Sequence, residues 1–210
     1  MAPVEPTGGV FSRPPVSRRR LEEPAPLPWI ASRPYYAWLV VGTVCIGAFM
    51  GQLDASIAQL VLPTLETVFV APLSSVEWVA LAYLLSLAAL LAPVGRLADI
   101  AGRKLLYTLG FFVFVVGSAL CGAAPNLPVL LGSRVLQAVG AAFLQANSVA
   151  IVTAAAGPGR RGKAIGIQGT AQAIGLSVGP ALGGLLISAF GWRWVFFINV
   201  PAGIVGIVAG

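Results

Sequence analysis

The feature that most constrains the fold is a succession of apolar runs, each of which is long enough to cross a lipid bilayer. A helix needs about 20 apolar residues to span the hydrocarbon core. Six runs meet or approach that length, at residues 36–62, 78–95, 105–124, 128–156, 164–190 and 194–210. Hydrophobic residues form 58% of the chain and charged residues only 10%, which excludes an ordinary soluble domain. Because helices satisfy their own backbone hydrogen bonds in lipid, an all-α integral membrane bundle is predicted.

The two ends of the chain differ from these spans. Residues 1–34 hold eight of the sixteen prolines and a run of three arginines, so they cannot bury enough apolar area to fold. They also lack the apolar core and the cleavage site of a secretory signal. We expect a disordered cytoplasmic tail at 1–34 and six transmembrane helices within 35–210. The last run is barely long enough to span, so the chain is expected to be the first half of a longer protein, with the carboxy-terminal half missing.

Lys and Arg are distributed unevenly between the two sides of the predicted bundle. Eleven of the thirteen lie in the tail or in the connections at residues 96–104 and 160–163, and only Arg193 lies in a connection on the other side. Cytoplasmic loops carry such an excess. We therefore expect a multi-pass protein of the cell membrane with a cytoplasmic amino terminus. Nucleic acid is not an expected partner, because these residues fill the gaps between spans and form no basic face with interleaved aromatics.

Two charges lie inside the predicted spans, Asp54 in the first and Arg134 in the fourth. Ionisable residues at membrane depth are usually turned inward, paired, and used for ions, protons or substrate. If Pro63 and Pro128 mark the outer ends of these spans, Asp54 lies about 13 Å deep and Arg134 about 9 Å deep at 1.5 Å per residue. We predict that both face a water-filled cavity and couple transport to protons. A static ion pair that only fixes helix packing is the alternative.

Uncharged polar and aromatic side chains in or near the spans are candidates for a substrate cavity, or for hydrogen bonds between helices. The polar candidates are Gln52, Gln59, Gln137, Gln145, Asn147, Gln168 and Gln172. The aromatic candidates, which would suit a lipophilic cation, are Phe49, Tyr83 and Phe143. The expected partners are therefore a small-molecule substrate, protons and the lipid bilayer.

Neither a cofactor, a metal site nor an enzymatic activity is predicted. Histidine is absent, and Cys45 and Cys121 have no metal-ligand spacing, so both cysteines are expected to pack as small hydrophobes. Residues 157–164 have the glycine and lysine spacing of a phosphate-binding loop. However, Ala164 stands where a magnesium-binding Ser or Thr is required, and the segment joins two spans. A basic turn is expected there.

Four motifs together resemble the major facilitator superfamily. GRLADIAGRK at residues 95–104 resembles its signature GxLADxxGRK, and residues 134–140 are similar to its RxxQGxG element. Residues 175–184 fit the GxxxGPxxGG pattern of its antiporters. Residues 53–63 and 192–201 resemble the fourteen-span drug:proton antiporter branch. The resemblance implies a six-helix amino-terminal bundle of such a transporter.

The resemblance also implies that the 95–104 connection is a conformational latch, in which Asp99 acts near a helix terminus of the second half. The residues concerned are Gly95, Arg96, Asp99, Gly102, Arg103 and Lys104. From the residues themselves, the two glycines would permit close backbone approach or positive φ, and Asp99 and Arg103 would pair if the turn is helical. A solvated positive loop is the alternative.

A glycine face is predicted in the fifth span, for which packing and gating both remain open as roles. Gly175, Gly179 and Gly183 recur every four residues, which allows close helix approach, and Pro180 can bend the helix. Gly184 completes the antiporter pattern.

These patterns predict a secondary active transporter that exports amphipathic drugs or other small molecules in exchange for protons. A metabolite or siderophore exporter on the same fold is the first alternative. A membrane receptor or scaffold that transports nothing is the alternative from another class.

Overall fold

The computed structural model describes residues 35–209, and the regular structure in this part of the chain is helical. The elements are α2 (Tyr36–Phe69), α3 (Leu73–Val76), α4 (Trp78–Ala101), α5 (Arg103–Ala123), α6 (Leu127–Ala156), the 3₁₀ turn η1 (Pro158–Arg160), α7 (Arg161–Phe190), α8 (Trp194–Phe197) and α9 (Asn199–Ala209). Five of the described helices are long and apolar enough to cross a membrane, and Trp194–Ala209 forms a shorter apolar segment. The predicted all-α membrane bundle is confirmed, whereas the predicted tail at 1–34 lies outside the described residues.

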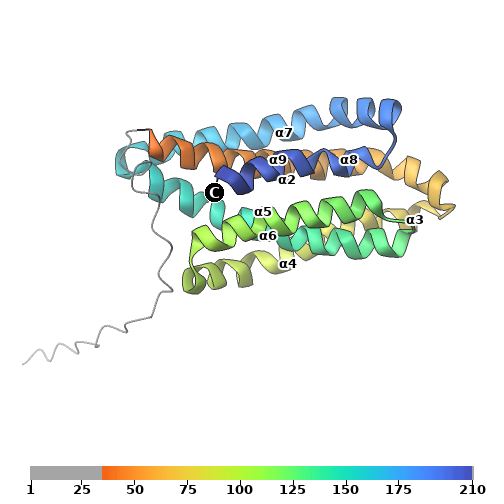
Figure 1. Ribbon diagram of the computed structural model, residues 1–210, viewed down its shortest axis with the longest axis horizontal. Helices are drawn as coiled ribbons and strands as arrows, with labels where there is room; N and C mark the ends of the chain where they lie inside the picture. Colours follow the sequence, from red (N-terminus) through yellow and green to blue (C-terminus); the bar gives the residue numbers. More distant parts are fainter. Residues whose placement is uncertain (1–34, 210) are drawn as a thin grey trace, which may run out of the picture.

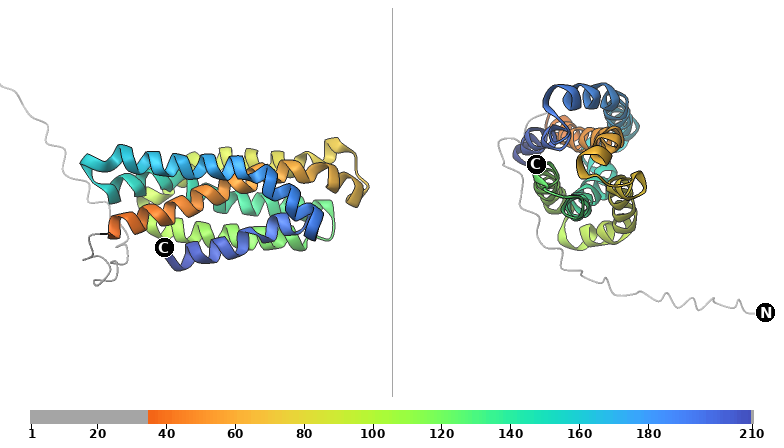
Figure 2. Two further views of the ribbon diagram at one scale, coloured as in Figure 1. Left: turned by 90° about the horizontal axis from the view of Figure 1, so that it is seen from above. Right: turned by 90° about the vertical axis from the view of Figure 1, so that its right-hand side faces the viewer.

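The long helices run along the long axis of the bundle, and successive long helices run in opposite directions (Figure 1). The start of α2, the α4–α5 turn and the α6–α7 turn lie together at one end of the bundle (Figure 2). At that end, Lys163 Nζ of α7 lies 5.4 Å from the centroid of the Trp38 ring of α2. Within the bundle, α2 packs against α7, α6 and α9, and α6 also packs against α5 and α4. Helices α2 and α6 therefore link α7, which packs against α2, to α4 and α5, which pack against α6.

Two predicted span ends differ from the structure. Helix α2 continues through Pro63 and ends at Phe69, where Val70 adopts a left-handed conformation with φ 49°. Pro63 is therefore not the end from which the depth of Asp54 should be counted. Helix α4 continues through Pro93 to Ala101, so most of the predicted 95–104 connection is helical. Proline is tolerated in membrane helices because neighbouring groups can satisfy the carbonyl that it leaves free.

The last predicted span, 194–210, is divided at Ile198 into the short helices α8 and α9. Pro201 explains the position of this break. Proline has no N–H, so the carbonyl of Phe197, four residues earlier, cannot receive the usual helical hydrogen bond. Asn199 thereby becomes the first residue of α9.

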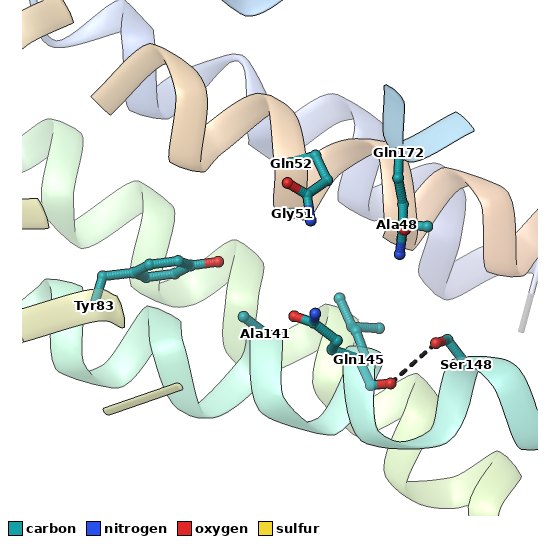
Figure 3. A pocket seen from close by; sticks show the side chains of 10 residues that line it. Ala48, Gly51, Gln52, Tyr83, Ala141, Gln145, Ser148 and Gln172 are labelled. Carbon is teal, nitrogen blue, oxygen red and sulfur yellow. Dashed lines mark hydrogen bonds between the residues drawn. The ribbon is translucent and has the colours of Figure 1, made fainter. Parts of the chain in front are cut away.

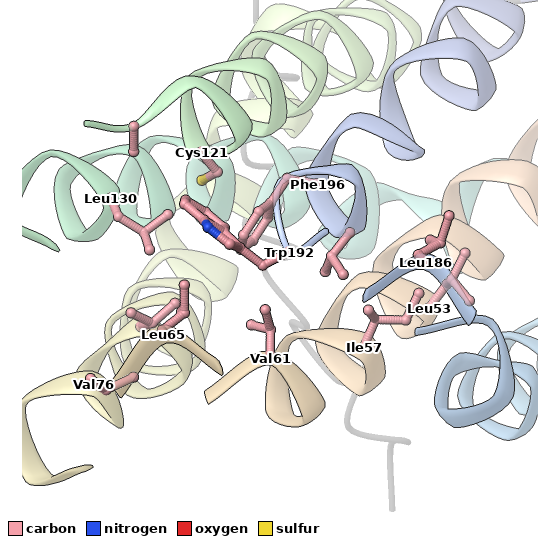
Figure 4. Close-up of a cluster of buried hydrophobic side chains, with 13 residues drawn as sticks. Leu53, Ile57, Val61, Leu65, Val76, Cys121, Leu130, Leu186, Trp192 and Phe196 are labelled. Atoms are coloured by element: carbon pink, nitrogen blue, oxygen red, sulfur yellow. The ribbon is translucent and has the colours of Figure 1, made fainter. Parts of the chain in front are cut away.

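The core consists of two apolar clusters with a polar layer between them. One cluster lies toward the α5–α6 turn and includes Leu53, Ile57, Val61, Leu130 and Phe196 (Figure 4). The other lies toward the α4–α5 turn and includes Val44, Met50, Phe111, Phe114 and Leu144. Buried polar residues separate the two clusters on α2, α5, α6 and α9, and this layer holds the candidate site.

Candidate functional site

Asp54 and Arg134 form an ion pair in the middle of the bundle. Arg134 Nη1 donates to Asp54 Oδ2 at 2.7 Å, and both side chains are only 1% exposed. The proximity that the sequence predicts is therefore present. The predicted water-filled surroundings are not seen in this conformation, because helices α2, α4, α5, α6, α8 and α9 enclose the pair.

Three uncharged residues, Ser118, Gln137 and Asn199, bond to this pair or to one another. Together with Asp54 and Arg134 they form what we call the polar layer. Gln137 Nε2 donates to Asp54 Oδ1 at 2.9 Å and to Ser118 Oγ at 2.6 Å. Asn199 Nδ2 donates to the same two atoms, at 2.8 and 3.1 Å. Both carboxylate oxygens of Asp54 are therefore engaged by donors from other helices.

The guanidinium of Arg134 has further partners besides Asp54. Its Nε donates to the Val79 carbonyl of α4 at 3.0 Å, and its Nη1 donates to Gln137 Oε1 at 2.6 Å. Its Cζ lies 4.2 Å from the centroid of the Tyr83 ring and 5.7 Å from that of Phe196. Aromatic faces attract cations, most strongly when water is excluded. Arg134 is thus held even without its acidic partner.

A pocket lies beside the polar layer, between α2, α4, α6 and α7 (Figure 3). Three of the predicted cavity residues line it: Gln52, Gln145 and Gln172. The other lining residues are Gly47, Ala48, Gly51, Tyr83, Ala141, Leu144 and Ser148. Tyr83 belongs to both sites, because its ring packs on Arg134 and also borders the pocket. Among these lining residues no side chain is charged, so the recognition chemistry is that of amides, hydroxyls and an aromatic ring.

The other predicted cavity residues lie elsewhere. Gln137 belongs to the polar layer, and Gln59 is exposed on α2 and is not among the lining residues of this pocket, so its place in a substrate cavity stays a prediction. Gln168 is buried behind the pocket, where its Nε2 donates to Ser148 Oγ at 2.9 Å. Asn147 donates to the Phe143 carbonyl of its own helix at 2.8 Å. Of the three predicted aromatic residues, Tyr83 alone is among the lining residues of this pocket.

Sequence reasoning did not assign Ser118 and Asn199 to the site. Both are uncharged polar residues within apolar runs, which is the criterion that selected the glutamines. That signal is weak, since Ser133 meets it too and only bonds the Val129 carbonyl of its own helix. The tertiary packing of α5 and α9 is needed to identify the two.

The predicted glycine face packs against α2. A Cβ at Gly175 would lie 2.6 Å from the Phe49 carbonyl oxygen, and one at Gly183 would lie 3.0 Å from Ile57 Cγ2. Gly184, in contrast, meets no other described part of the chain within 4 Å. It therefore does not belong to the close-packed face, because it is turned away from α2.

Pro180 has a specific effect on this contact. It has no N–H, so the Leu176 carbonyl, four residues earlier in α7, lacks its helical partner. The Ser56 hydroxyl of α2 donates to that carbonyl at 3.0 Å. A hydrogen bond between helices replaces the one that proline removes, and α7 remains continuous from Arg161 to Phe190.

The predicted latch is a nearly continuous helical segment with one special glycine. Gly102 has φ 98°, as a turn between α4 and α5 requires. Gly95 is helical, without positive φ, and an added Cβ there would meet nothing within 4 Å among the described residues, so neither use of this glycine is seen. Asp99 and Arg103 pair at 2.9 Å on the surface. Such exposed pairs contribute little stability, and Arg96 and Lys104 are exposed nearby. A latch role for this segment stays a prediction.

Comparisons with known proteins identify the family of this fold. A family model described as Major Facilitator Superfamily matches residues 44–210. The chain is 43% identical over 173 residues to the riboflavin transporter RibZ of Clostridioides difficile, covering 82% of this chain and 38% of that protein. It is 38% identical over 159 residues to the multidrug resistance protein Stp of Mycobacterium tuberculosis, covering 75% of this chain and 30% of that protein. The chain therefore spans well under half the length of these relatives.

The fold also matches solved structures. The proton:xylose symporter XylE superposes with a TM-score of 0.73 at 16% identity, covering 82% of this chain and 44% of that chain. At this identity the likeness establishes the fold alone. The similarity to Stp confirms the predicted resemblance to the drug-export branch. Since the family model matches most of its length, the chain belongs to the major facilitator superfamily.

Proposed function

We propose that this chain is part of a secondary active transporter of the cell membrane that exports small organic molecules in exchange for protons, with Asp54 as the proton carrier. The observation that carries the proposal is the Asp54–Arg134 pair, which is buried in the middle of membrane-spanning helices. A receptor or scaffold has no need of such a pair, which is expensive at this depth. The whole carrier is the protein of which this chain forms part.

The contacts of the pair support a simple coupling mechanism. With Asp54 ionised, Arg134 binds it directly and draws α2 toward α6. Protonation of the carboxylate removes this attraction, while Arg134 keeps the Val79 carbonyl, Gln137 and the Tyr83 ring. The contact between α2 and α6 is thereby weakened and the helices can shift. Because Tyr83 also borders the pocket, a bound substrate would act on the same guanidinium.

Two substrate classes are candidates. The likeness to the multidrug resistance protein Stp favours amphipathic drugs. The likeness to the riboflavin transporter RibZ favours a neutral metabolite such as riboflavin. One observation supports this second candidate: the described lining carries three glutamine amides and no charge, so a cation would find no counter-ion there.

Uptake into inside-out vesicles that contain the whole carrier tests the proposed function. We expect an imposed proton gradient to drive uptake of riboflavin or of the lipophilic cation tetraphenylphosphonium, and a protonophore to reduce that uptake to the level of empty vesicles. Uptake of riboflavin alone would favour the second candidate, and uptake of the cation would favour drug export. Uptake that persists without the gradient would contradict proton coupling.

The orientation of the bundle is also a proposal, supported by the distribution of charge. The α4–α5 and α6–α7 turns, which carry described basic residues, lie at the end that we assign to the cytoplasm (Figure 2). Arg193 lies at the opposite end, where its Nη2 donates to the Ala124 carbonyl beside the α5–α6 turn. A cysteine replacing Gly162 should resist an impermeant maleimide in intact cells and react after permeabilisation. A cysteine replacing Pro125, exposed at the opposite end, is the matched control and should react in intact cells. The reverse pattern would contradict the orientation.

A further inference from the structure

Asn199 occupies an unusual place in the bundle. It is 1% exposed and is the first residue of α9, directly after the break that Pro201 causes. Its Nδ2 donates to Asp54 Oδ1 of α2 and to Ser118 Oγ of α5. One amide group therefore connects three helices at the carboxylate.

The helix that carries Asn199 is fixed to α5 on both sides of the break. On one side, the ring of Phe197 covers Gly122, where an added Cβ would lie 2.8 Å from the ring. On the other side, a Cβ at Gly203 would collide with the side chain of Val115. Helices α8 and α9 are therefore packed closely against α5, and Asn199 and Ser118 lie side by side next to Asp54.

We infer that Asn199 is a positioning residue that makes proton uptake by Asp54 depend on the place of α5 and α9 relative to α2. While the helices are packed as in this structure, the amide donates to the carboxylate and stabilises its charged form. When α9 moves away from α2, that donor is lost and the carboxylate binds a proton more readily. The inference rests on the proposed function, in which Asp54 carries the proton.

The other ionisable groups that face Asp54 do not duplicate this role. Arg134 reaches it from α6, Tyr83 from α4 and Cys121 from α5. The segments of α7, α8 and α9 that lie near it contribute no titratable side chain among the described residues. Asn199 is thus the contact through which α9 acts on this carboxylate.

Infrared difference spectroscopy of the purified whole carrier tests the inference without a substrate. The C=O stretch of a protonated carboxyl is recorded across pH, and the band of Asp54 is the one lost in Asp54→Asn. In Asn199→Ala and in Asn199→Leu, whose side chain has a similar branched shape but no hydrogen-bond donor, we expect the midpoint of that band to move to higher pH by about one unit, a tenfold change in proton affinity. Two variants are used because the alanine also leaves a cavity.

Asn147→Ala is the matched control. It removes a buried amide that bonds only its own helix, so it should leave the midpoint unchanged. An unshifted midpoint in both Asn199 variants would overturn the inference and leave Asn199 a packing residue, even if the protein were less stable. If Asp54→Asn keeps every carboxyl band that titrates in the wild type, Asp54 does not titrate, and the proposed function is contradicted instead.

Discussion

Asp54→Asn is expected to abolish proton-driven export in the whole carrier, reducing it to the level of empty vesicles, while the protein remains folded. Asparagine has the shape of aspartate but cannot exchange a proton at neutral pH. Arg134 would still bind the Val79 carbonyl, Gln137 and the Tyr83 ring, so its charge would not be left without partners. Substrate-induced proton release and export, measured on the same preparation, check the expectation.

A purely structural ion pair predicts a different result. Removing one partner of a buried pair typically costs about 3–5 kcal/mol, because the other charge is left uncompensated. Asp54→Asn would then lower expression or stability, and neutralising Arg134 as well would restore it. Unchanged proton release in Asp54→Asn would exclude Asp54 as the carrier. Asp54→Glu is a further control, since it keeps the titrating group on a longer side chain and should retain part of the activity.

The charged pair could be predicted from the sequence because charges are rare in apolar runs. Asp54 and Arg134 each stand out against about 20 apolar neighbours, and the alternating direction of the spans places them at similar depth. Their similar depth needs no knowledge of side-chain packing, whereas their direct contact depends on how the two helices are turned. The depth argument nevertheless used Pro63 as a helix end, although α2 continues to Phe69. Proline is a weaker helix terminator in membrane helices than in soluble ones.

The remainder of the site depends on which way each helix faces, and sequence periodicity does not specify that rotation. Gln52 and Gln59 lie on the same helix with the same chemistry, yet only Gln52 lines the pocket. Ser118 and Asn199 enter the polar layer because α5 and α9 both pack beside α2 and α6 at that level. A polar residue in a span is therefore a candidate, and the packing of its helix decides its role.

Two glycines of one motif also differ in the way they face on their helix. A sequence pattern groups Gly179 with Gly184, but a Cβ at Gly179 would lie 2.6 Å from Ser56 Cβ, whereas one at Gly184 would meet nothing within 4 Å in the part of the chain that the structure describes. Gly179→Leu should therefore destabilise the chain by about 1–3 kcal/mol, the usual range for overpacking. It should also displace Ser56 from the Leu176 carbonyl that Pro180 leaves free. Thermal unfolding of the purified chain in detergent measures the loss.

Gly184→Leu provides the matched control on the same helix. Both substitutions gain the same helix propensity, about 1 kcal/mol over glycine, so the difference between the two variants isolates the contact with α2. We expect Gly184→Leu to unfold at the wild-type temperature or slightly above it, and Gly179→Leu to unfold clearly below it. Equal unfolding temperatures would contradict the close contact between α2 and α7. In the whole carrier, a packing role for this face predicts that Gly179→Leu loses stability and transport together, whereas a gating role predicts leaky transport by a protein that remains folded.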